Sequence, residues 1–506
     1  MIDLGNLEKY RENNRIEAKK ALGGLPHSIW ETYSSFANTL GGIILLGVEE
    51  HKDKTLHAID LPYPEKLINE FWDIVNNPNK VNVNILTNNH VRIEEINGCR
   101  IVIIEVPRAQ RYYKPVYVDG NPVTGTYRRN GEGDYHCTEE ELRAMYRDAD
   151  IRTQDMLIME QMGFSVFCSD SINAYRQRMS LSRPNHVWEQ LDDEEFLMRL
   201  GAMGIGSDGK LHPTAAGLLM FGYEFEIVRE YPQYFLDYRE EYDDTHRWTD
   251  RIISSSGDWS GNIFDFFYRV YNRIQLDIKV PFETRDGFRI DDTPVHGALR
   301  EALANCLINA DYYGRRGLVI IQRRDMITIS NPGDFRVGLD EARAGGLSDP
   351  RNSVLMKMFN LIDIGERAGS GIPSILYTWK QQGWSEPTIT LTSEPNCVVL
   401  SLPLTTSADN TKSADNSADN GNSALISGSD DTESADKAKK ALIKASAQKE
   451  MIVSYLTDYP DTTTADLCRL LDLKPTRVRM LLRQLIAANI VIAVGGNRNR
   501  TYRLRS

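Results

Sequence analysis

The sequence has no run of eighteen uncharged apolar residues, so we expect no membrane-spanning segment. It opens Met1-Ile2-Asp3-Leu4, without a basic region followed by an apolar one, so we expect no secretory signal. Its six cysteines are scattered singly and form no Cys-x-x-Cys pair, which argues against a disulfide framework and a zinc site. A Gly-x-x-x-x-Gly-Lys-Ser/Thr loop is also missing, which disfavours helicase activity. These absences predict a cytoplasmic protein with no membrane partner.

What is present is a long chain of ordinary globular composition. At 506 residues it is too long for a single hydrophobic core, so we expect several domains. The net charge of −12 would disfavour a nucleic-acid partner, but phosphate binding depends on local basic patches. Residues 474–506 hold eight cationic side chains and no acidic one. The charge is therefore segregated along the chain.

The clearest domain boundary is a change in composition. From Thr405 to about Ala445 the chain is rich in Ser, Ala, Asp, Asn, Gly and Lys, and the tetrapeptide Ser-Ala-Asp-Asn occurs three times. Such a segment cannot bury enough apolar surface to offset its ordering entropy, so we expect a disordered linker. The fold class expected is a multidomain α+β protein. An α+β domain at 1–150 is followed by a mostly helical connecting region at 151–290, an α/β domain at 291–404, the linker at 405–445 and a small C-terminal domain at 446–506.

Residues 295–313 carry the most informative pattern. Ala, Leu and Cys dominate, so a helix here should be buried over most of its circumference. Glu301, Asn305 and Asn309 nevertheless recur at intervals of four and form one polar stripe. A buried carboxylate and buried carboxamides need partners, which a ligand or a structural hydrogen-bond network could supply.

The order of the elements after this helix favours a ligand. A predicted hairpin at 318–330 leads into Asn331-Pro332-Gly333, and a glycine-rich stretch at 365–371 opens another helix. Glycines that lead into a helix N-terminus offer free backbone N–H groups and allow close approach, as in phosphate binding. We therefore expect a nucleotide phosphate site.

This arrangement resembles the GHKL ATP-binding fold of gyrase, Hsp90, histidine kinases and MutL, an α/β sandwich. The resemblance covers residues 295–404 and is strongest to bacterial proteins described as helicase-related or as transcriptional regulators. It implies a slow ATPase that uses ATP and Mg²⁺, with Glu301 as the base for the attacking water and Asn305 as the Mg²⁺ ligand. Asn309 would also line the nucleotide site, and Gly369, Ser370 and Gly371 would close over the phosphates. Asn331 and Gly333 would read adenine, although the family has aspartate where this chain has Asn331.

The first domain carries a second specific run, Phe36-Ala37-Asn38-Thr39-Leu40-Gly41-Gly42, which breaks a helix and leads into a buried strand. The region 1–148 is similar to the Schlafen/AlbA-type nucleic-acid-binding domain. The resemblance implies that Glu12, Glu17 and Glu49 occupy the positions of an acidic trio that serves metal-dependent RNA cleavage in some relatives. The alternative is that they are solvated glutamates in a binding domain.

Cations and aromatic residues interleave at 108–129, a pattern typical of nucleic-acid contact. The candidate nucleic-acid-binding residues of this stretch are Arg111, Lys114, Arg128 and Arg129. An ordinary hairpin with amphipathic tyrosines would give the same pattern.

At 446–506 the pattern predicts three helices followed by a hairpin with a basic tip, the plan of a winged helix. Its candidate DNA-binding residues are Arg477, Arg479, Arg483, Arg498 and Arg500. The alternative is a winged helix that contacts protein.

Two functions follow. In the first, the protein is a transcriptional regulator in which ATP controls both its assembly and its binding to DNA. RNA is the alternative nucleic-acid partner. GHKL relatives imply a homo-oligomer, either a dimer or a larger ring. In the second, the protein is an ATP-gated nuclease of Schlafen type that acts in stress or phage defence.

Overall fold

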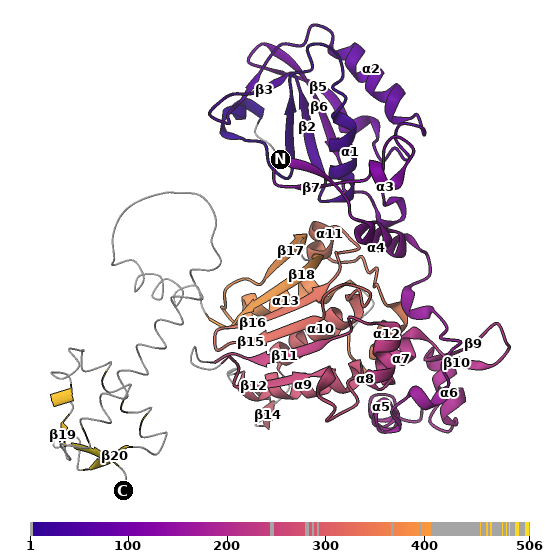
Figure 1. The fold of residues 1–506 in the computed structure, drawn as a ribbon, viewed down its shortest axis with the longest axis vertical. Coiled ribbons are helices and arrows are strands. Elements are labelled where there is room, and N and C mark those ends of the chain that lie inside the picture. Colours follow the sequence, from indigo (N-terminus) through magenta and orange to yellow (C-terminus); the bar gives the residue numbers. More distant parts are fainter. Residues whose placement is uncertain are drawn as a thin grey trace. The chain divides into compact units, whose positions relative to one another are not determined.

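The structure is a computed structural model of the 506-residue chain. It describes residues 4–242, 247–278, 283–285, 288–290, 293–365, 369–393 and 396–405, together with short pieces of the C-terminal region. By internal contacts the chain forms two units, Met1–Asn416 and Ser417–Ser506 (Figure 1). In the described residues, no helix is both long and apolar enough to cross a membrane.

A four-stranded sheet forms the core of the N-terminal part of the first unit. Its strand order is β1 (Ile16–Lys19), β2 (Gly42–Leu46), β6 (Cys99–Val106) and β5 (Val91–Ile96), and only the β1–β2 pair is parallel. Successive residues of β2 point to opposite faces, so Ile44 and Leu46 join one hydrophobic cluster and Leu45 joins another. Helices α1 (Ile29–Asn38) and α2 (Pro64–Val75) cover the first of these faces. The remaining elements are β3 (Val48–Glu50), β4 (Leu56–Ala58), α3 (Pro122–Gly125), β7 (Tyr127–Asn130), β8 (Gly133–His136) and α4 (Glu139–Ala149).

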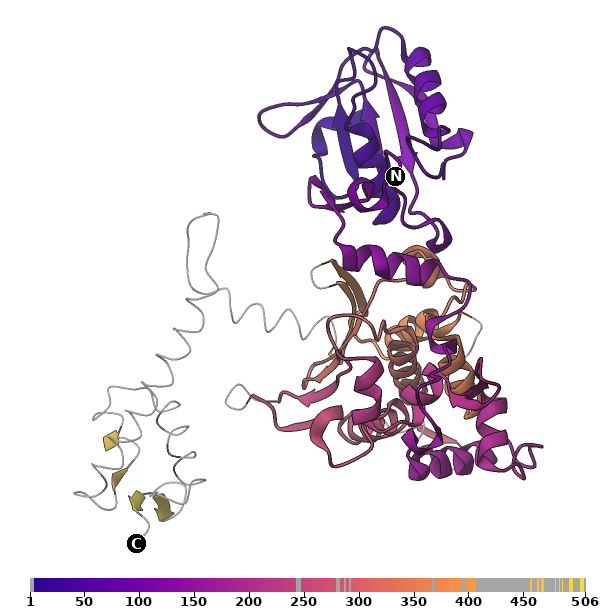
Figure 2. The ribbon, with the colours of Figure 1, turned by 45° about the vertical axis from the view of Figure 1, so that its right-hand side comes forward.

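The stretch expected to be mostly helical, 151–290, holds both helices and strands (Figure 2). Its described α-helices are α5 (Ser169–Ser182), α6 (Asp193–Leu200), α7 (Ala215–Phe221), α8 (Glu224–Glu230) and α9 (Ile263–Asp277), and the short strands β9 (Met203–Ile205) and β10 (Leu211–Pro213) form a hairpin. One buried carboxylate ties this stretch to the next: Asp155 accepts hydrogen bonds from Val354 N at 2.7 Å and Leu355 N at 3.0 Å. It thereby satisfies the free N–H groups at the start of α12 (Ser353–Leu361).

A six-stranded sheet forms the second half of this unit (Figure 1). Its order is β12 (Asp250–Ile253), β11 (Leu236–Glu240), β15 (Leu318–Gln322), β16 (Met326–Pro332), β18 (Asn396–Pro403) and β17 (Thr388–Ser393). The sheet therefore crosses the boundary expected at residue 291, because β11 pairs in parallel with β15. The other described elements here are β13 (Glu283–Arg285), β14 (Phe288–Ile290), α10 (Pro294–Asn309), α11 (Leu339–Ala344) and α13 (Gly371–Gln381).

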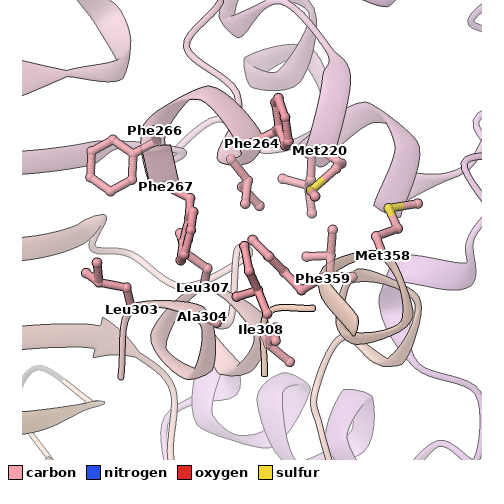
Figure 3. Close-up of a cluster of buried hydrophobic side chains, with 14 of the residues drawn as sticks. Met220, Phe264, Phe266, Phe267, Leu303, Ala304, Leu307, Ile308, Met358 and Phe359 are labelled. Atoms are coloured by element: carbon pink, nitrogen blue, oxygen red, sulfur yellow. The ribbon is translucent and has the colours of Figure 1, made fainter. Parts of the chain in front are cut away.

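The helix α10 is packed between the sheet and its neighbouring helices. Helix α9 brings Phe264 and Phe267 against Leu307 and Ile308 of α10, and Phe359 of α12 completes the contact (Figure 3). The rings of Phe267 and Phe359 have centroids 5.3 Å apart. Close packing of this kind leaves α10 one direction in which to present polar side chains.

The described residues of the second unit include a three-stranded antiparallel sheet and a few helical residues. Its order is β19 (Thr462–Thr463), β21 (Thr501–Leu504) and β20 (Val491–Val494). The pairing of β20 with β21 is the hairpin that the sequence predicts. The three predicted helices lie largely outside the described residues.

The packing around α10 generates a stability prediction. Replacing Phe359, which is fully buried, with alanine should destabilise the first unit by about 3–5 kcal/mol, because it removes apolar contacts and leaves a cavity. The matched control is Phe225→Ala, since Phe225 is 62% exposed on α8 and its loss should change the free energy of unfolding by less than about 0.5 kcal/mol. Urea unfolding followed by tryptophan fluorescence measures both, and equal effects would contradict the assignment of this core.

Candidate functional site

The polar stripe of α10 lies on the one face of the helix that is not fully buried. The helix begins at Pro294 behind a capping box in which Thr293 and His296 bond to each other. Within 301–310 only Glu301, Asn305 and Asn309 are partly exposed. Asn305 Nδ2 donates to Glu301 Oε1 at 2.9 Å, and Asn309 Nδ2 donates to Asn305 O at the same distance. The stripe is therefore a connected row of polar groups.

All three side chains of the stripe line a cavity of about 150 Å³. The sheet supplies the apolar side of this cavity through Ile329, Ile389, Val398 and Leu400. A cavity that is apolar on one side and carries a few convergent polar groups suits a flat ring with a charged tail.

The start of α13 closes the polar end of the cavity. A Cβ on Gly371 would lie 2.7 Å from Asn305 Nδ2 and closer still to Glu301 Oε1, so only glycine lets the α13 backbone approach the pair. Gly369 has a φ of +66°, which glycine adopts without strain. Both glycines line the cavity, and the α13 N-terminus supplies the free N–H groups that phosphates bind. Ser370 lies between them but is not part of the lining.

Asn331 at the end of β16 is the polar group of the lining that most clearly lacks a protein partner. The residue is only 9% exposed, and within the part of the chain that the structure describes its amide makes no hydrogen bond. Because Asn331 lines the cavity, its amide donor and acceptor are available to a ligand there. Gly333, which follows, has a φ of +98° and is not in the lining.

The remaining wall of the cavity consists of residues 334–337 and 347–351, which the sequence did not single out as binding residues. Arg351 holds the two stretches together: its guanidinium donates to Asp334 O at 2.6 Å and to Asn309 O at 3.1 Å. It also pairs with Asp148 of α4 at 2.7 Å. The sequence signals near this wall are the glycines at 338, 345 and 346 and the tripeptide Pro350-Arg351-Asn352 that follows them.

Two of the predicted nucleic-acid-binding cations, Arg111 and Lys114, lie behind this wall and are bonded to other protein groups. Arg111 Nε donates to Asp349 at 2.5 Å, and Arg111 Nη1 bonds to two backbone carbonyls of the α4 end. Lys114 Nζ donates to Asn38 O at 2.6 Å. Burial, with the neighbouring Arg108 adding to the effect, lowers the pKa of Lys114 to about 8.

The other two predicted cations are also engaged inside the protein. Arg128 pairs with Glu141 at 3.1 Å. Arg129 has a side chain only 1% exposed and pairs with Glu17 at 2.8 Å and Asp134 at 3.0 Å. These four side chains therefore hold the domain together, and in this arrangement they do not form an exposed surface for phosphates.

The acidic trio is only partly brought together. Glu49 pairs with Lys20 on the surface, and Glu17 pairs with Arg129 and with Lys19. Burial raises the pKa of Glu12, and the charges of Glu17 and Glu50 raise it further, so Glu50 is the third carboxylate near Glu12. No group of three His, Cys, Asp or Glu in the described residues could hold a metal ion. The alternation of side chains along β3, which sends Glu49 and Glu50 to opposite faces, was the available signal.

The remaining predicted site residues lie outside the described residues. These are Arg477, Arg479, Arg483, Arg498 and Arg500. Residues 366–368, within the glycine-rich stretch 365–371, lie outside them as well.

Comparison with known families identifies the two halves of the first unit. Residues 12–138 match the family "Schlafen, AlbA_2", and residues 319–400 match "Putative ATP-dependent DNA helicase recG C-terminal". Residues 143–237 match a domain of unknown function. The chain therefore contains a Schlafen AlbA_2 domain and a RecG-C-terminal-like ATPase domain, and together these indicate a nucleic-acid-binding ATPase that uses ATP.

Two solved structures are similar to the chain. The crystal structure of the DIP2311 protein from Corynebacterium diphtheriae is 15% identical and covers 97% of this chain and 95% of its own, with a TM-score of 0.38. The solution structure of the N-terminal domain of a "Putative ATP-dependent DNA Helicase RecG-related Protein" from Nitrosomonas europaea is 28% identical and covers 27% of this chain and 95% of its own, with a TM-score of 0.22. No curated protein matches the chain.

The close approach of α13 to the stripe generates a test of the site. Gly371→Ala should displace the Glu301 and Asn305 side chains and weaken binding of a fluorescent ATP analogue by about tenfold or more, because a new Cβ has no space there. Gly297→Ala on α10 is the matched control, since the nearest atom to the new Cβ would be Arg300 Nη2 at 3.9 Å. Unchanged nucleotide affinity in Gly371→Ala would place the nucleotide elsewhere.

Proposed function

We propose that the protein is an ATP-binding, DNA-binding regulator in which a GHKL-type nucleotide site controls how the rest of the chain engages nucleic acid. The observation that carries the proposal is the cavity in which the α10 stripe, the α13 N-terminus and the unpartnered Asn331 amide meet. Most of the cavity belongs to the segment that matches the RecG-C-terminal-like ATPase family.

The donor set of the cavity suits Mg-ATP. Asn305 uses its Nδ2 on Glu301, which leaves Oδ1 with no hydrogen-bond partner among the described residues and available as a hard oxygen ligand. We propose that Asn305 would hold Mg²⁺, which when bound would neutralise charge on the phosphates. Glu301 lies one helical turn away and would orient and deprotonate the attacking water. Asn331 would accept from the adenine amino group, and Gly369 and Gly371 would approach the phosphates.

The wall of the cavity offers a route from nucleotide to the first domain. Asp334 and Asp349 both line the cavity, and they pair with Arg108 at 2.8 Å and Arg111 at 2.5 Å from the AlbA_2 domain. Both ion pairs are partly buried, so a nucleotide that moves either stretch must also move or break its ion pair with the first domain. We propose that ATP occupancy is read by the first domain through these contacts.

The C-terminal unit would supply the DNA-binding winged helix. Its described residues include buried apolar side chains both on the sheet and outside it, namely Leu456, Leu467, Val478, Leu482, Leu485, Val491 and Tyr502. This arrangement supports the proposed winged helix, in which the basic stretch 474–506 would meet phosphates. We further propose that nucleotide binding promotes a dimer or a larger assembly.

The proposed roles of the stripe separate binding from hydrolysis. Asn305→Ala should abolish measurable Mg-ATP binding, because it removes the metal ligand. Glu301→Gln should bind Mg-ATP but lose hydrolysis by a factor of about 100 or more, because the amide cannot accept the proton. Calorimetry and phosphate release measure the two properties. Equal Mg-ATP affinity in wild type and Asn305→Ala would remove the nucleotide site from this helix.

The proposed coupling makes a separate prediction. The full chain should bind duplex DNA more tightly with a non-hydrolysable ATP analogue than without it, as measured by fluorescence anisotropy with sizing in parallel. Asp349→Asn, at saturating analogue, should lose most of this difference because the charge that Arg111 pairs with is gone. Asp340→Asn, at an exposed aspartate in the first turn of α11, is the control and should retain it. Identical affinities and sizes with and without the analogue would reduce the nucleotide to a structural ligand.

A further inference from the structure

A second cavity, of about 110 Å³, lies where the AlbA_2 domain meets the ATPase domain, and its lining is strongly cationic. Arg108, Arg111, Lys114 and Arg128 come from the first domain, and Arg336 comes from the stretch that follows β16. The hydroxyl-bearing Thr39 at the end of α1 also contributes. This cavity is separate from the α10 stripe, since none of the three stripe residues lines it.

The charges of this lining do not balance. The lining holds five cationic side chains and three carboxylates, Glu141, Asp148 and Asp334. Asp349, just outside the lining, pairs with both Arg111 and Arg336. When Asp349 and the Asp148 partner Arg351 are counted as well, six cations face four carboxylates, which leaves two positive charges in excess. Glu141 is paired with Arg128, and Asp334 is paired with Arg108. Asp148 bonds to Arg351, which lies outside the lining. Among the described residues, no carboxylate lies within salt-bridge distance of Lys114, and its one hydrogen bond there is to a carbonyl.

The donors of the lining are also not used up. The Lys114 ammonium has three N–H groups and, among the described residues, spends one of them on Asn38 O. Arg336 has a side chain only 5% exposed, and its buried Nε has no hydrogen-bond partner among the described residues. Buried cationic donors without acceptors are costly, and an anion in the cavity would satisfy them.

We propose that this second cavity is a binding site for a phosphate monoester or for inorganic phosphate. A phosphate group of this class carries a charge of about −1.5 to −2 at pH 7 and three strong acceptor oxygens, which matches the two excess positive charges and the unused donors. The site goes beyond the proposed nucleotide function, and it stands whether or not ATP occupies the first cavity.

The two cavities share one wall. Asp334, Phe335 and Arg336 line both of them, so a phosphate in the second cavity contacts the same stretch that a nucleotide would contact in the first. The second site would therefore bias the nucleotide site through this stretch, and by linkage the reverse holds to the same extent.

Isothermal titration of the full chain with inorganic phosphate tests the proposal. Wild type should bind, and Lys114→Gln should bind about tenfold more weakly or worse, since it loses a charged donor. The matched control is Lys80→Gln, because Lys80 pairs with Asp119 away from the cavity and its loss should leave phosphate affinity unchanged. Arg108→Gln, with thermal unfolding in parallel, provides a second variant if Lys114→Gln does not fold.

The pH dependence gives an independent readout. Lys114, which faces Arg108, Asp334, Asp148 and Cys137, has a pKa of about 8, so it carries its charge at pH 7 and has mostly lost it by pH 9. This measurement uses a simple phosphate monoester as the ligand, because its second ionisation lies near pH 6 and its charge hardly changes over that range. The monoester's affinity should therefore fall between pH 7 and pH 9 in wild type and stay nearly flat in Lys114→Gln.

Competition separates the sources of the phosphate. A 5′-phosphorylated oligonucleotide that displaces inorganic phosphate, while its 5′-hydroxyl counterpart does not, would identify the end of a nucleic-acid strand. Failure of both to compete would identify a free small anion. Absence of phosphate binding in wild type would overturn the proposal. So would loss of binding in Asn305→Ala with retention in Lys114→Gln, because the phosphate would then lie in the nucleotide cavity.

Discussion

The nucleotide-binding half of the first unit depends on one buried guanidinium, that of Arg351. The side chain is only 6% exposed, and burying a charged group is unfavourable unless its donors are paired. Its partners come from three different places: Asp148 at the end of α4, the Asn309 carbonyl at the end of α10, and the Asp334 carbonyl after β16. Because each partner is fixed by this one cation, the last turn of the polar stripe, the cavity wall and the helix that leaves the first domain take up their positions together.

This constraint explains why the cavity and its wall depend on residues from more than one matched segment. The match to the RecG-C-terminal-like ATPase family begins at residue 319, after α10 has ended, so the stripe itself lies outside it. Asp148 belongs to the segment that matches a domain of unknown function, and Arg111 belongs to the AlbA_2 segment. Three matched segments therefore converge on residues 334–351. A truncation that separated them would leave Arg351 and Asp349 as buried or half-buried charges without partners, so the first unit should behave as one cooperative piece.

The features that could be predicted from the sequence are those that depend on the spacing of residues close together in the chain. The stripe at 301, 305 and 309 follows from helical spacing, and the hairpin of β15 and β16 follows from two apolar runs around Arg323-Arg324-Asp325. The pairing of β11 with β15 could not be predicted, because it joins residues about eighty positions apart in parallel and no turn fixes its register. The same holds for Glu50, whose approach to Glu12 depends on how β1 and β3 meet.

The interleaved cations at 108–129 show that the same local pattern of charge can belong either to a nucleic-acid-binding surface or to an interface between domains. Arg111 and Arg108 find their carboxylates at Asp349 and Asp334, more than two hundred residues away, so a count of nearby acidic residues reports an excess of charge that the fold largely removes. Among the described residues, Lys114 is the cation of this stretch that bonds to a carbonyl and to no carboxylate, and it lines the second cavity. A nucleic-acid surface on the first domain must then be sought among cations that stay exposed, such as Arg11, Arg15 and Lys52. A phosphate can bind the charges that the fold leaves unpaired, and a count of charges along the sequence does not identify them.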